Sequence, residues 1–293
     1  MAHGDQERWT VLRLLDWTKG HFGRRGVDSP RLAAEVLLGH ALNCQRVMLY
    51  ARFDYQPTPA ELSAFRELVR RAAEHEPVAY LVGHKEFYSL TFRVTPDVLV
   101  PRAETEILVA EAVGHLRTLG RPGIMWDVCT GCGCVAVATA HQVPDVRVLA
   151  TDICAKALAV AEENVRRHGL AERVRCRQAD LLALPKDCAD LEDFDVIAGN
   201  PPYVANGHPV GETVRREPRI AVFAGPDGMA LLGPTIRSAA GLLRAGGKLI
   251  LEFGYDQADS VRDAIAATGA YDEPKILCDH QEIERVAVAA RRG

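Results

Sequence analysis

The sequence predicts an α/β protein in which a doubly wound parallel sheet follows a small helical domain. From Ile124 onward, short apolar runs typical of buried strands alternate with helical segments, and this alternation is the pattern of a parallel sheet. Before residue 84, helical periodicity dominates instead. We therefore expect a helical N-terminal domain at residues 1–83, a β-hairpin linker at residues 84–100 and the sheet domain at residues 101–293.

Composition limits the class of protein. The chain has 293 residues, of which 48% are hydrophobic, and this is enough to bury a full core. The net charge of −4 argues against a surface built to hold nucleic acid. No apolar run approaches the ~20 residues that span a bilayer, and residues 1–7 lack a basic stretch leading into an apolar one. We expect a monomeric, cytoplasmic protein without membrane or nucleic acid partners, and with reduced cysteines.

The first two helices are expected near the N-terminus. One has apolar positions at helical spacing, namely Val11, Leu14, Leu15, Thr18 and Phe22. The next begins at Ser29 and Pro30, a cap followed by proline at the first helical position. Its buried side is expected to contain Leu32, Val36 and Leu37.

A third helix has the clearest start in the sequence. Thr58 and Glu61 form a capping box, and Pro59 occupies the first helical position. One apolar face follows, formed by Leu62, Phe65, Leu68, Val69 and Ala72. The pair Arg70–Arg71 is expected to lie on the solvated face of this helix.

Residues 86–94 have the aromatic and β-branched content of strands, so a hairpin is expected there. Next come Arg102, Glu104 and Glu106, which precede an apolar helix at residues 107–116. These charges fit either the N-terminus of that helix or the lining of a cleft between domains.

Four parallel strands are expected in the sheet domain, at residues 124–128, 146–150, 174–177 and 194–198. A tight turn at residues 129–133 follows the first strand, and helices are expected at residues 135–141 and 156–168. Asp152 stands at the tip of the second strand. A glycine turn followed by such an acid is typical of adenosyl ribose binding, because backbone groups approach the ligand and the carboxylate takes the hydroxyls.

Polar residues are expected to meet at the carboxyl edge of this sheet, because parallel strands all end there. In chain order they are Asp127, Asp152, Asp180 with Leu181, and the tetrapeptide Asn200-Pro201-Pro202-Tyr203. The turn lacks the third glycine of a dinucleotide fingerprint, and the chain lacks the Gly-Lys-Ser/Thr of a phosphate loop. This pattern favours a ligand without phosphates.

The tetrapeptide that begins at Asn200 suits a planar NH2 group. Its two prolines have no N–H, so the backbone offers carbonyls, and Asn200 adds a side-chain carbonyl oxygen. The Tyr203 ring gives a planar group a face to stack on. The alternative is an Asn-Pro turn that only ends the strand, as most such dipeptides do.

Over nearly its full length, the chain resembles the N5-glutamine methyltransferases of peptide chain release factors, the PrmC/HemK family. Besides the tetrapeptide, the motifs that carry the resemblance are Tyr80-Leu81-Val82-Gly83, Glu86-Phe87-Tyr88, Val100-Pro101-Arg102-Ala103-Glu104-Thr105-Glu106, Glu217-Pro218-Arg219, Gly225-Pro226-Asp227-Gly228 and Glu252-Phe253-Gly254-Tyr255. The resemblance implies a class I S-adenosylmethionine-dependent methyltransferase with a Rossmann-like sheet. It also implies that the acceptor is the glutamine of the Gly-Gly-Gln loop in class 1 release factors.

The resemblance assigns roles to the residues at the sheet edge. S-adenosylmethionine would contact Cys129, Thr130, Gly131, Cys132, Gly133, Asp152, Asp180, Leu181 and Asn200. The acceptor amide would be held by Asn200, Pro201, Pro202 and Tyr203.

Cys129 departs from the family, which usually has glycine there. A β-carbon restricts φ and crowds the ligand, although Gly131 and Gly133 remain. A metal site is an alternative explanation of the cysteines near this turn, Cys129, Cys132, Cys134 and Cys154. We favour small buried thiols and expect no metal, because structural zinc sites usually have paired Cys-x-x-Cys units or histidines.

The expected chemistry is mainly positioning, because an amide nitrogen is a poor nucleophile and a sulfonium methyl group is already activated. The acceptor amide would donate its two N–H bonds to the Asn200 oxygen and the Pro201 carbonyl, while Tyr203 packs against its plane. No general base is assigned. Three alternatives stay open: a ribosomal-protein glutamine methyltransferase, a DNA adenine-N6 methyltransferase and a non-catalytic release-factor docking protein.

The rest of the chain is expected to complete the sheet. A glycine- and proline-rich run from residue 204 to 228 should form a long loop over the site, as a platform for a protein substrate. A helix at residues 231–244 should then end at Gly246–Gly247. The last expected elements are a strand at 248–253, a helix at 257–268 and an antiparallel pair at 274–278 and 285–290.

Overall fold

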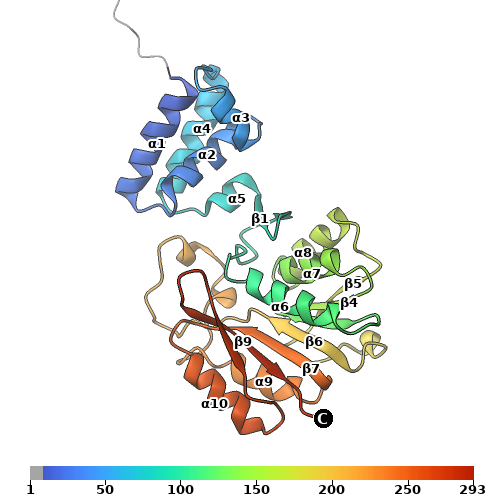
Figure 1. Cartoon of the computed structure of the whole chain (residues 1–293). Helices are drawn as coiled ribbons and strands as arrows, with labels where there is room; N and C mark the ends of the chain where they lie inside the picture. Colours follow the sequence, from blue (N-terminus) through green and yellow to red (C-terminus); the bar gives the residue numbers. More distant parts are fainter. Residues whose placement is uncertain (1–8) are drawn as a thin grey trace, which may run out of the picture. The chain divides into compact units, whose positions relative to one another are not determined.

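A computed structural model describes residues 9–293, and the N-terminal stretch 1–7 discussed above lies outside this range. The chain divides into two compact units. The first contains the chain up to Gly83 together with Val210–Arg216, and the second contains His84–Pro209 and Glu217–Gly293. Figure 1 shows helices in the first unit, and a sheet covered by helices in the second.

The first unit is helical in the part that the structure describes. Its α-helices are α1 (Val11–Arg25), α2 (Pro30–Ala41), α3 (Arg46–Ala51), α4 (Pro59–Ala73) and α5 (Val78–Val82). The predicted capping box of α4 is confirmed, because Glu61 N donates to Thr58 Oγ1 at 3.3 Å and Thr58 N donates to Glu61 Oε2 at 2.7 Å. Arg70 pairs with Glu67 and Glu74 on the solvated face, as expected.

The predicted buried faces hold for α1 and α4, and only in part for α2. All five predicted positions of α1 are buried, and in α4 only Leu62 is half-buried. In α2, the predicted Leu37 is buried and Val36 is half-buried, but Leu32 is 40% exposed. The prediction was wrong for Leu32, because α2 contacts α1, α3, α4 and α5, and these four neighbours set its buried side. Ser29 makes no side-chain cap.

The second unit begins with the predicted hairpin and continues into a seven-stranded sheet. The hairpin strands are β1 (His84–Phe87) and β2 (Leu90–Arg93). The sheet strands are β3 (Ile124–Val128), β4 (Arg147–Asp152), β5 (Val174–Gln178), β6 (Phe194–Gly199), β7 (Leu243–Glu252), β8 (Lys275–Cys278) and β9 (Glu284–Ala290). Their order is β5-β4-β3-β6-β7-β9-β8; the first five are parallel and β9 is antiparallel to both its neighbours.

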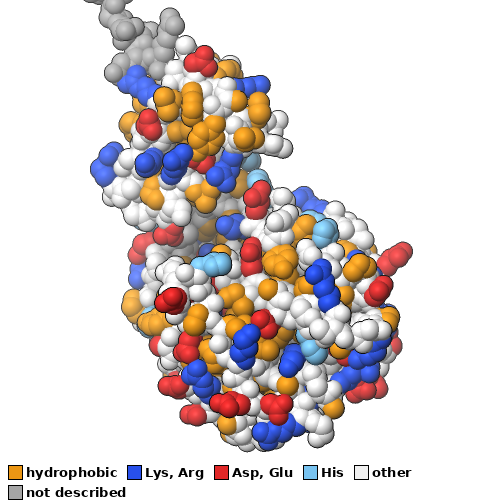
Figure 2. Space-filling model, viewed as in Figure 1, with side chains coloured by type: hydrophobic (Ala, Val, Ile, Leu, Met, Phe, Trp, Pro, Cys, Tyr) orange, Lys and Arg blue, Asp and Glu red, His pale blue; other side chains and the backbone are white. Residues whose placement is uncertain are grey.

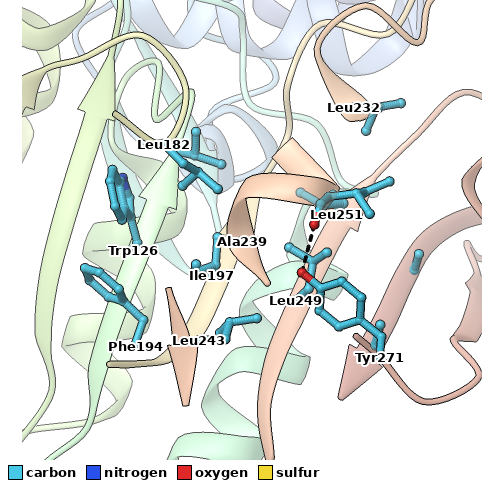
Figure 3. Close-up of a cluster of buried hydrophobic side chains, with 14 of the residues drawn as sticks. Trp126, Leu182, Phe194, Ile197, Leu232, Ala239, Leu243, Leu249, Leu251 and Tyr271 are labelled. Carbon is cyan, nitrogen blue, oxygen red and sulfur yellow. Dashed lines mark hydrogen bonds between the residues drawn. The ribbon is translucent and has the colours of Figure 1, made fainter. Parts of the chain in front are cut away.

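Helices cover both faces of the sheet (Figure 1). One face carries α6 (Glu106–Arg117), α7 (Cys134–Gln142) and α8 (Ala155–Arg167), and the other carries α9 (Leu232–Ala239) and α10 (Ala258–Thr268). Figure 3 shows the core under α9, where Trp126 and Phe194 lie side by side with ring centroids 5.0 Å apart. Tyr271 O–H donates to the Ile236 carbonyl at 2.8 Å, so its polar end is satisfied inside the core.

The predicted boundary between α9 and β7 was wrong. The helix ends at Ala239 rather than near residue 244, and β7 begins at Leu243. Gly246 and Gly247 therefore lie inside the strand, where the pairing of β7 with β6 shifts register. They exchange backbone hydrogen bonds with Arg291, and this pairing with a distant segment makes them part of the sheet.

Candidate active site

The central strands of the sheet end level with one another. Val128 of β3 pairs with Thr151 of β4 on one side and with Gly199 of β6 on the other. Cys129 follows the end of β3, Asp152 is the last residue of β4, and Asn200 follows the end of β6. The chain order reverses between β3 and β6, and ligands of open α/β sheets bind at such a point.

The turn after β3 is held by a buried carboxylate. Asp127, 1% exposed, accepts hydrogen bonds at Oδ2 from Thr130 Oγ1 at 2.5 Å and from Ala136 N at 3.1 Å. Burial raises the pKa of the Asp127 carboxyl to about 7. Cys129 adopts a left-handed conformation with φ 57°, as do Gly131 and Gly133. The turn thus imposes a glycine-like backbone on a cysteine.

Asp152 is oriented by the backbone around it. Its Oδ2 accepts from Gly131 N at 3.0 Å and its Oδ1 accepts from Cys154 N at 2.9 Å. Burial raises the pKa of this carboxyl above its usual value. The carboxylate is therefore fixed between two turns, and each oxygen has a lone pair left for a ligand hydroxyl.

A cavity of about 330 Å³ lies along this edge, entirely within the second unit. Of the predicted site residues, it is lined by Cys129, Thr130, Gly131, Cys132, Asp152, Asp180, Leu181, Asn200 and Pro202. Its walls also include residues that the sequence did not indicate as ligands of the methyl donor or the acceptor, namely Thr105, Ile153, Cys154, Ala157, Ile220 and Phe223. The last two lie in the glycine- and proline-rich run after Tyr203, which the sequence predicted to form a loop over the site.

Three predicted residues do not line the cavity: Gly133, Pro201 and Tyr203. At Gly133, a β-carbon would lie 3.2 Å from the Ala161 Cβ, so this glycine lets α8 approach the turn. Pro201 is buried, and Tyr203 is half-buried against the core. A glycine that allows close packing and a glycine that contacts a ligand look the same in the sequence. Only the position of α8 shows that Gly133 is of the first kind.

The Asn200 end of the cavity is built from side chains far apart in the chain. Asn200 Nδ2 donates to Thr105 Oγ1 at 3.1 Å, and Thr105 Oγ1 donates to Glu252 Oε2 at 2.7 Å. Tyr203 O–H donates to the other oxygen, Glu252 Oε1, at 3.2 Å. Thr105 and Glu252 were not predicted as site residues, although a buried acid at the end of an apolar strand such as β7 was a usable signal.

Of the cysteines near the turn, Cys132 and Cys134 are buried, whereas Cys129 and Cys154 are half-buried. Burial, followed by the charges of Asp152 and Asp127, raises the pKa of the Cys129 thiol, and Cys134 is shifted in the same direction. Within residues 9–293, no three His, Cys, Asp or Glu side chains are grouped in a way that could hold a metal ion.

Comparison with known proteins agrees with this geometry. Residues 13–83 match the family described as "PrmC N-terminal domain", and residues 105–217 match "Methyltransferase small domain". The chain is 43% identical to the release factor glutamine methyltransferase of Rhodopirellula baltica over 95% of both chains. It is also 43% identical to the protein of that name from Moorella thermoacetica, covering 97% of this chain and 99% of the relative.

Solved structures support the fold. A methyltransferase from Pyrococcus furiosus has a TM-score of 0.51 and 18% identity, covering 76% of this chain and 98% of that chain. The human Mettl16 catalytic domain, solved in complex with an RNA hairpin, has a TM-score of 0.55 and 16% identity over 74% of this chain and 80% of that chain. Among residues 9–293, no helix is both long and apolar enough to cross a membrane.

The fold and the site define a class I methyltransferase that uses S-adenosylmethionine. A cavity of about 330 Å³ is large enough for such a ligand, and the oriented Asp152 carboxylate suits its ribose hydroxyls. Within that class, the chain belongs to the family of release factor glutamine methyltransferases.

Proposed function

We propose that this protein transfers the methyl group of S-adenosylmethionine to the side-chain amide nitrogen of the glutamine in the Gly-Gly-Gln motif of class 1 peptide chain release factors. The similarity to the release factor glutamine methyltransferases of Rhodopirellula baltica and Moorella thermoacetica supports this class of acceptor. We further propose that the protein acts as a cytoplasmic monomer, without nucleic acid or membrane partners.

One observation carries the choice of an amide acceptor. The Asn200 NH2 group donates to Thr105, so the carbonyl oxygen of the Asn200 side chain is the atom left to accept a hydrogen bond at the cavity. The two prolines that follow supply carbonyls and no N–H groups. Such a set of acceptors matches the two N–H bonds of a primary amide.

These acceptors would raise the reactivity of the amide by placement. Bound S-adenosylmethionine supplies an activated methyl group. The acceptor amide would donate its N–H bonds to the Asn200 oxygen and the Pro201 carbonyl, and Pro202 would flank the amide plane. Tyr203 does not line the cavity and would support this arrangement through its hydrogen bond to Glu252. The N–C bond forms as the C–S bond breaks, S-adenosylhomocysteine leaves, and the amide proton passes to solvent.

We propose further roles for the remaining parts. The turn at residues 129–133, with Asp152, Asp180, Leu181 and Asn200, would hold the methyl donor. Residues 1–83 would recognise the protein substrate, residues 84–100 would link the domains, and residues 101–293 would carry the reaction.

The test is methyl transfer from labelled S-adenosylmethionine to a purified class 1 release factor. Matched samples contain its Gly-Gly-Gln glutamine→alanine variant, a ribosomal-protein fraction, duplex DNA, and the Asn200→Ala enzyme. We expect label in the intact release factor alone, and loss of label with either substitution. Label in ribosomal protein or DNA instead would reassign the acceptor. Intact S-adenosylmethionine binding without any transfer would leave a docking role and contradict the proposal.

A further inference from the structure

A chain of hydrogen bonds leads from the cavity to one buried carboxylate. It runs from Asn200 to Thr105 and from Thr105 to Glu252, where Tyr203 joins from the other side. Glu252 lies at the end of β7 and is 1% exposed, so solvent does not compete for its oxygens. The carboxylate is positioned to act on Asn200 without contacting the cavity itself, since Thr105 and Asn200 line the cavity and Glu252 does not.

When Glu252 is ionised, it is fixed which group donates and which accepts in every hydrogen bond of this series. A carboxylate only accepts hydrogen bonds, so the hydroxyls of Thr105 and Tyr203 must both donate to it. The single proton of Thr105 is then used, and its oxygen must accept from its other neighbour. An NH2 group is the only part of the Asn200 amide that can donate, so the nitrogen faces Thr105 and the oxygen faces away.

Protonation of Glu252 would leave the directions of these hydrogen bonds undetermined. A protonated Glu252 is a donor as well as an acceptor, so Thr105 could accept from it and turn its own proton toward Asn200. Either end of the Asn200 amide could then face Thr105, and a flipped amide would present an NH2 group to the cavity. An NH2 group cannot accept the N–H bond of an acceptor amide.

We propose that Glu252 is a positioning residue that acts through Thr105 to hold the carbonyl oxygen of Asn200 toward the acceptor amide, and that only its ionised form does so. The inference rests on the proposed function of this site. Glu252 contacts no substrate, and the hydrogen-bond direction is transmitted over two side chains from β7 to the end of β6.

The pKa of Glu252 allows its protonation state to change near neutral pH. Burial raises the pKa of the Glu252 carboxyl to about 7, against the lowering effect of the hydrogen bonds from Thr105 and Tyr203. Glu104, which lies before α6, raises it further, and Arg285 on β9 lowers it. Arg285 is itself held by Asp279 at 3.0 Å. Methyl transfer should therefore decline as pH falls through about 7.

The decisive experiment compares kcat against pH, from 5.5 to 8.5, for wild type and Glu252→Gln. Glutamine is both a donor and an acceptor, as the protonated acid is, so it cannot fix the direction of the Thr105 proton at any pH. We expect kcat of Glu252→Gln to be at least about tenfold below wild type at pH 8 and level across the pH range. As pH falls below 7, the wild type should decline toward the level of the variant, by up to about tenfold per pH unit.

A matched pair at Thr105 tests the transmission. Thr105→Ser keeps the hydroxyl and should retain kcat within about threefold, whereas the nearly isosteric Thr105→Val should lose kcat by about 10- to 100-fold. The KM for S-adenosylmethionine should stay unchanged in both, which a general loss of structure would not allow. Equal kcat in the serine and valine variants, or a wild-type pH profile in Glu252→Gln, would overturn the inference.

A second readout is independent of the acceptor. In ¹⁵N-labelled protein, the side-chain NH2 resonance of Asn200, identified by its loss in Asn200→Ala, should shift with pH in wild type and not in Glu252→Gln. If the resonance shifts with pH but no methyl group reaches the release factor, the effect of Glu252 on Asn200 is supported and only the proposed acceptor is contradicted. If the resonance does not change with pH in wild type, the proposed effect of Glu252 on Asn200 is contradicted, even if the release factor is methylated.

Discussion

The two ends of the cavity hold their polar groups by different means. At the turn after β3, backbone amides of Gly131 and Cys154 fix the Asp152 carboxylate, and left-handed backbone conformations set the shape. At the Asn200 end, side chains from three separate segments fix one another, and the series stops at a buried charge. The first end depends on conformation, and the second depends on the direction of hydrogen bonds.

This difference teaches what each end tolerates. Cys129 occupies a left-handed position without losing the turn, because the hydrogen bonds around Asp127 and Asp152 do not use its side chain. Asn200 should not tolerate substitution in this way, because the orientation of its side-chain amide depends on which neighbour donates a hydrogen bond and which accepts one. Substitutions at the two ends should therefore differ in kind as well as in size.

The largest effect should come from Asn200→Ala. Removing a positioned hydrogen-bond acceptor from a reacting group costs about 10²–10³ in kcat. The affinity for S-adenosylmethionine should fall by less than about tenfold, because Asn200 is one of several residues proposed to hold the methyl donor and the Asp152 end is untouched. Single-turnover methyl transfer together with equilibrium binding of the methyl donor measures both. A tenfold loss of affinity with little change in kcat would reverse the roles of the two ends.

The next largest effect should be on folding, at Gly228. A β-carbon there would lie 2.1 Å from the Tyr203 carbonyl oxygen and 2.4 Å from Gln257 Nε2, in a backbone with φ 77°. Gly228→Ala should lower the free energy of unfolding by about 2–4 kcal/mol. Gly131→Ala is the matched control, since it has φ 56° but nothing within 4 Å of the added carbon.

For this control we expect a loss of only about 1–2 kcal/mol, the cost of the left-handed conformation alone. Urea denaturation of both variants measures the difference. Equal losses would show that the close approach of residue 228 to Tyr203 is relieved at no cost, and would remove the contrast between the two ends.

At the turn, Asp152→Ala should weaken binding of S-adenosylmethionine about 10- to 100-fold. The variant loses charge-assisted hydrogen bonds, each of which contributes about 1.5–3 kcal/mol. Saturating donor should restore most of kcat, in contrast to Asn200→Ala. Isothermal titration calorimetry with S-adenosylmethionine tests the affinity, and unchanged binding would exclude Asp152 as a ligand of the ribose.

A smaller effect concerns the dependence of stability on pH. The pKa of Asp127 and that of Glu252 are each about 7 in the folded protein, above the ordinary values of 3.8 and 4.5. Both groups thus bind protons more tightly when folded, so their contribution to stability is present at low pH and is lost as pH rises through 7. Each contributes a slope of at most about 1.4 kcal/mol per pH unit.

The matched variants are Asp127→Asn and Glu252→Gln, each of which removes one titrating proton. The fall in the free energy of unfolding between pH 5 and 7 should become shallower in each and shallower still in the double variant. Denaturation at several pH values measures the slope, and a wild-type slope in the double variant would show that neither carboxyl is the source.

The smallest effect is expected for Cys129→Gly. Glycine relieves the cost of the left-handed conformation but adds freedom to the unfolded chain, so a net gain in stability of about 0.5–1 kcal/mol is expected. The melting temperature should rise by a few degrees at most. A lower melting temperature would mean that packing of the half-buried Cys129 thiol contributes more to stability than its left-handed conformation costs.

Much of the fold could be predicted from local patterns. Alternating apolar strands and helices predicted β3 to β6 to within a residue or two, and the capping box predicted the start of α4. Predictions failed where neighbours decided, as for the buried side of α2 and the boundary between α9 and β7. In both cases, pairing with distant segments outweighed the local signal.

The site was predictable in the same uneven way. Residues that follow strand ends, such as Asp152 and Asn200, could be placed together because parallel strands share one edge. Thr105 and Glu252 could not be joined to them, since they lie 147 residues apart in the chain. Arg102 and Glu217 pair across 115 residues, so the two sequence motifs that contain them meet only in the folded unit.

The sequence by itself determined which residues stand at the sheet edge, because periodicity and turn chemistry act within a few residues of each position. Only the tertiary structure decided what those residues can do there. The pairing of β6 with β7 and the placement of Thr105 before α6 bring three hydroxyl and carboxylate groups to Asn200. Hydrogen-bond direction is a property of such a group of neighbours, and no single segment of the chain contains them all.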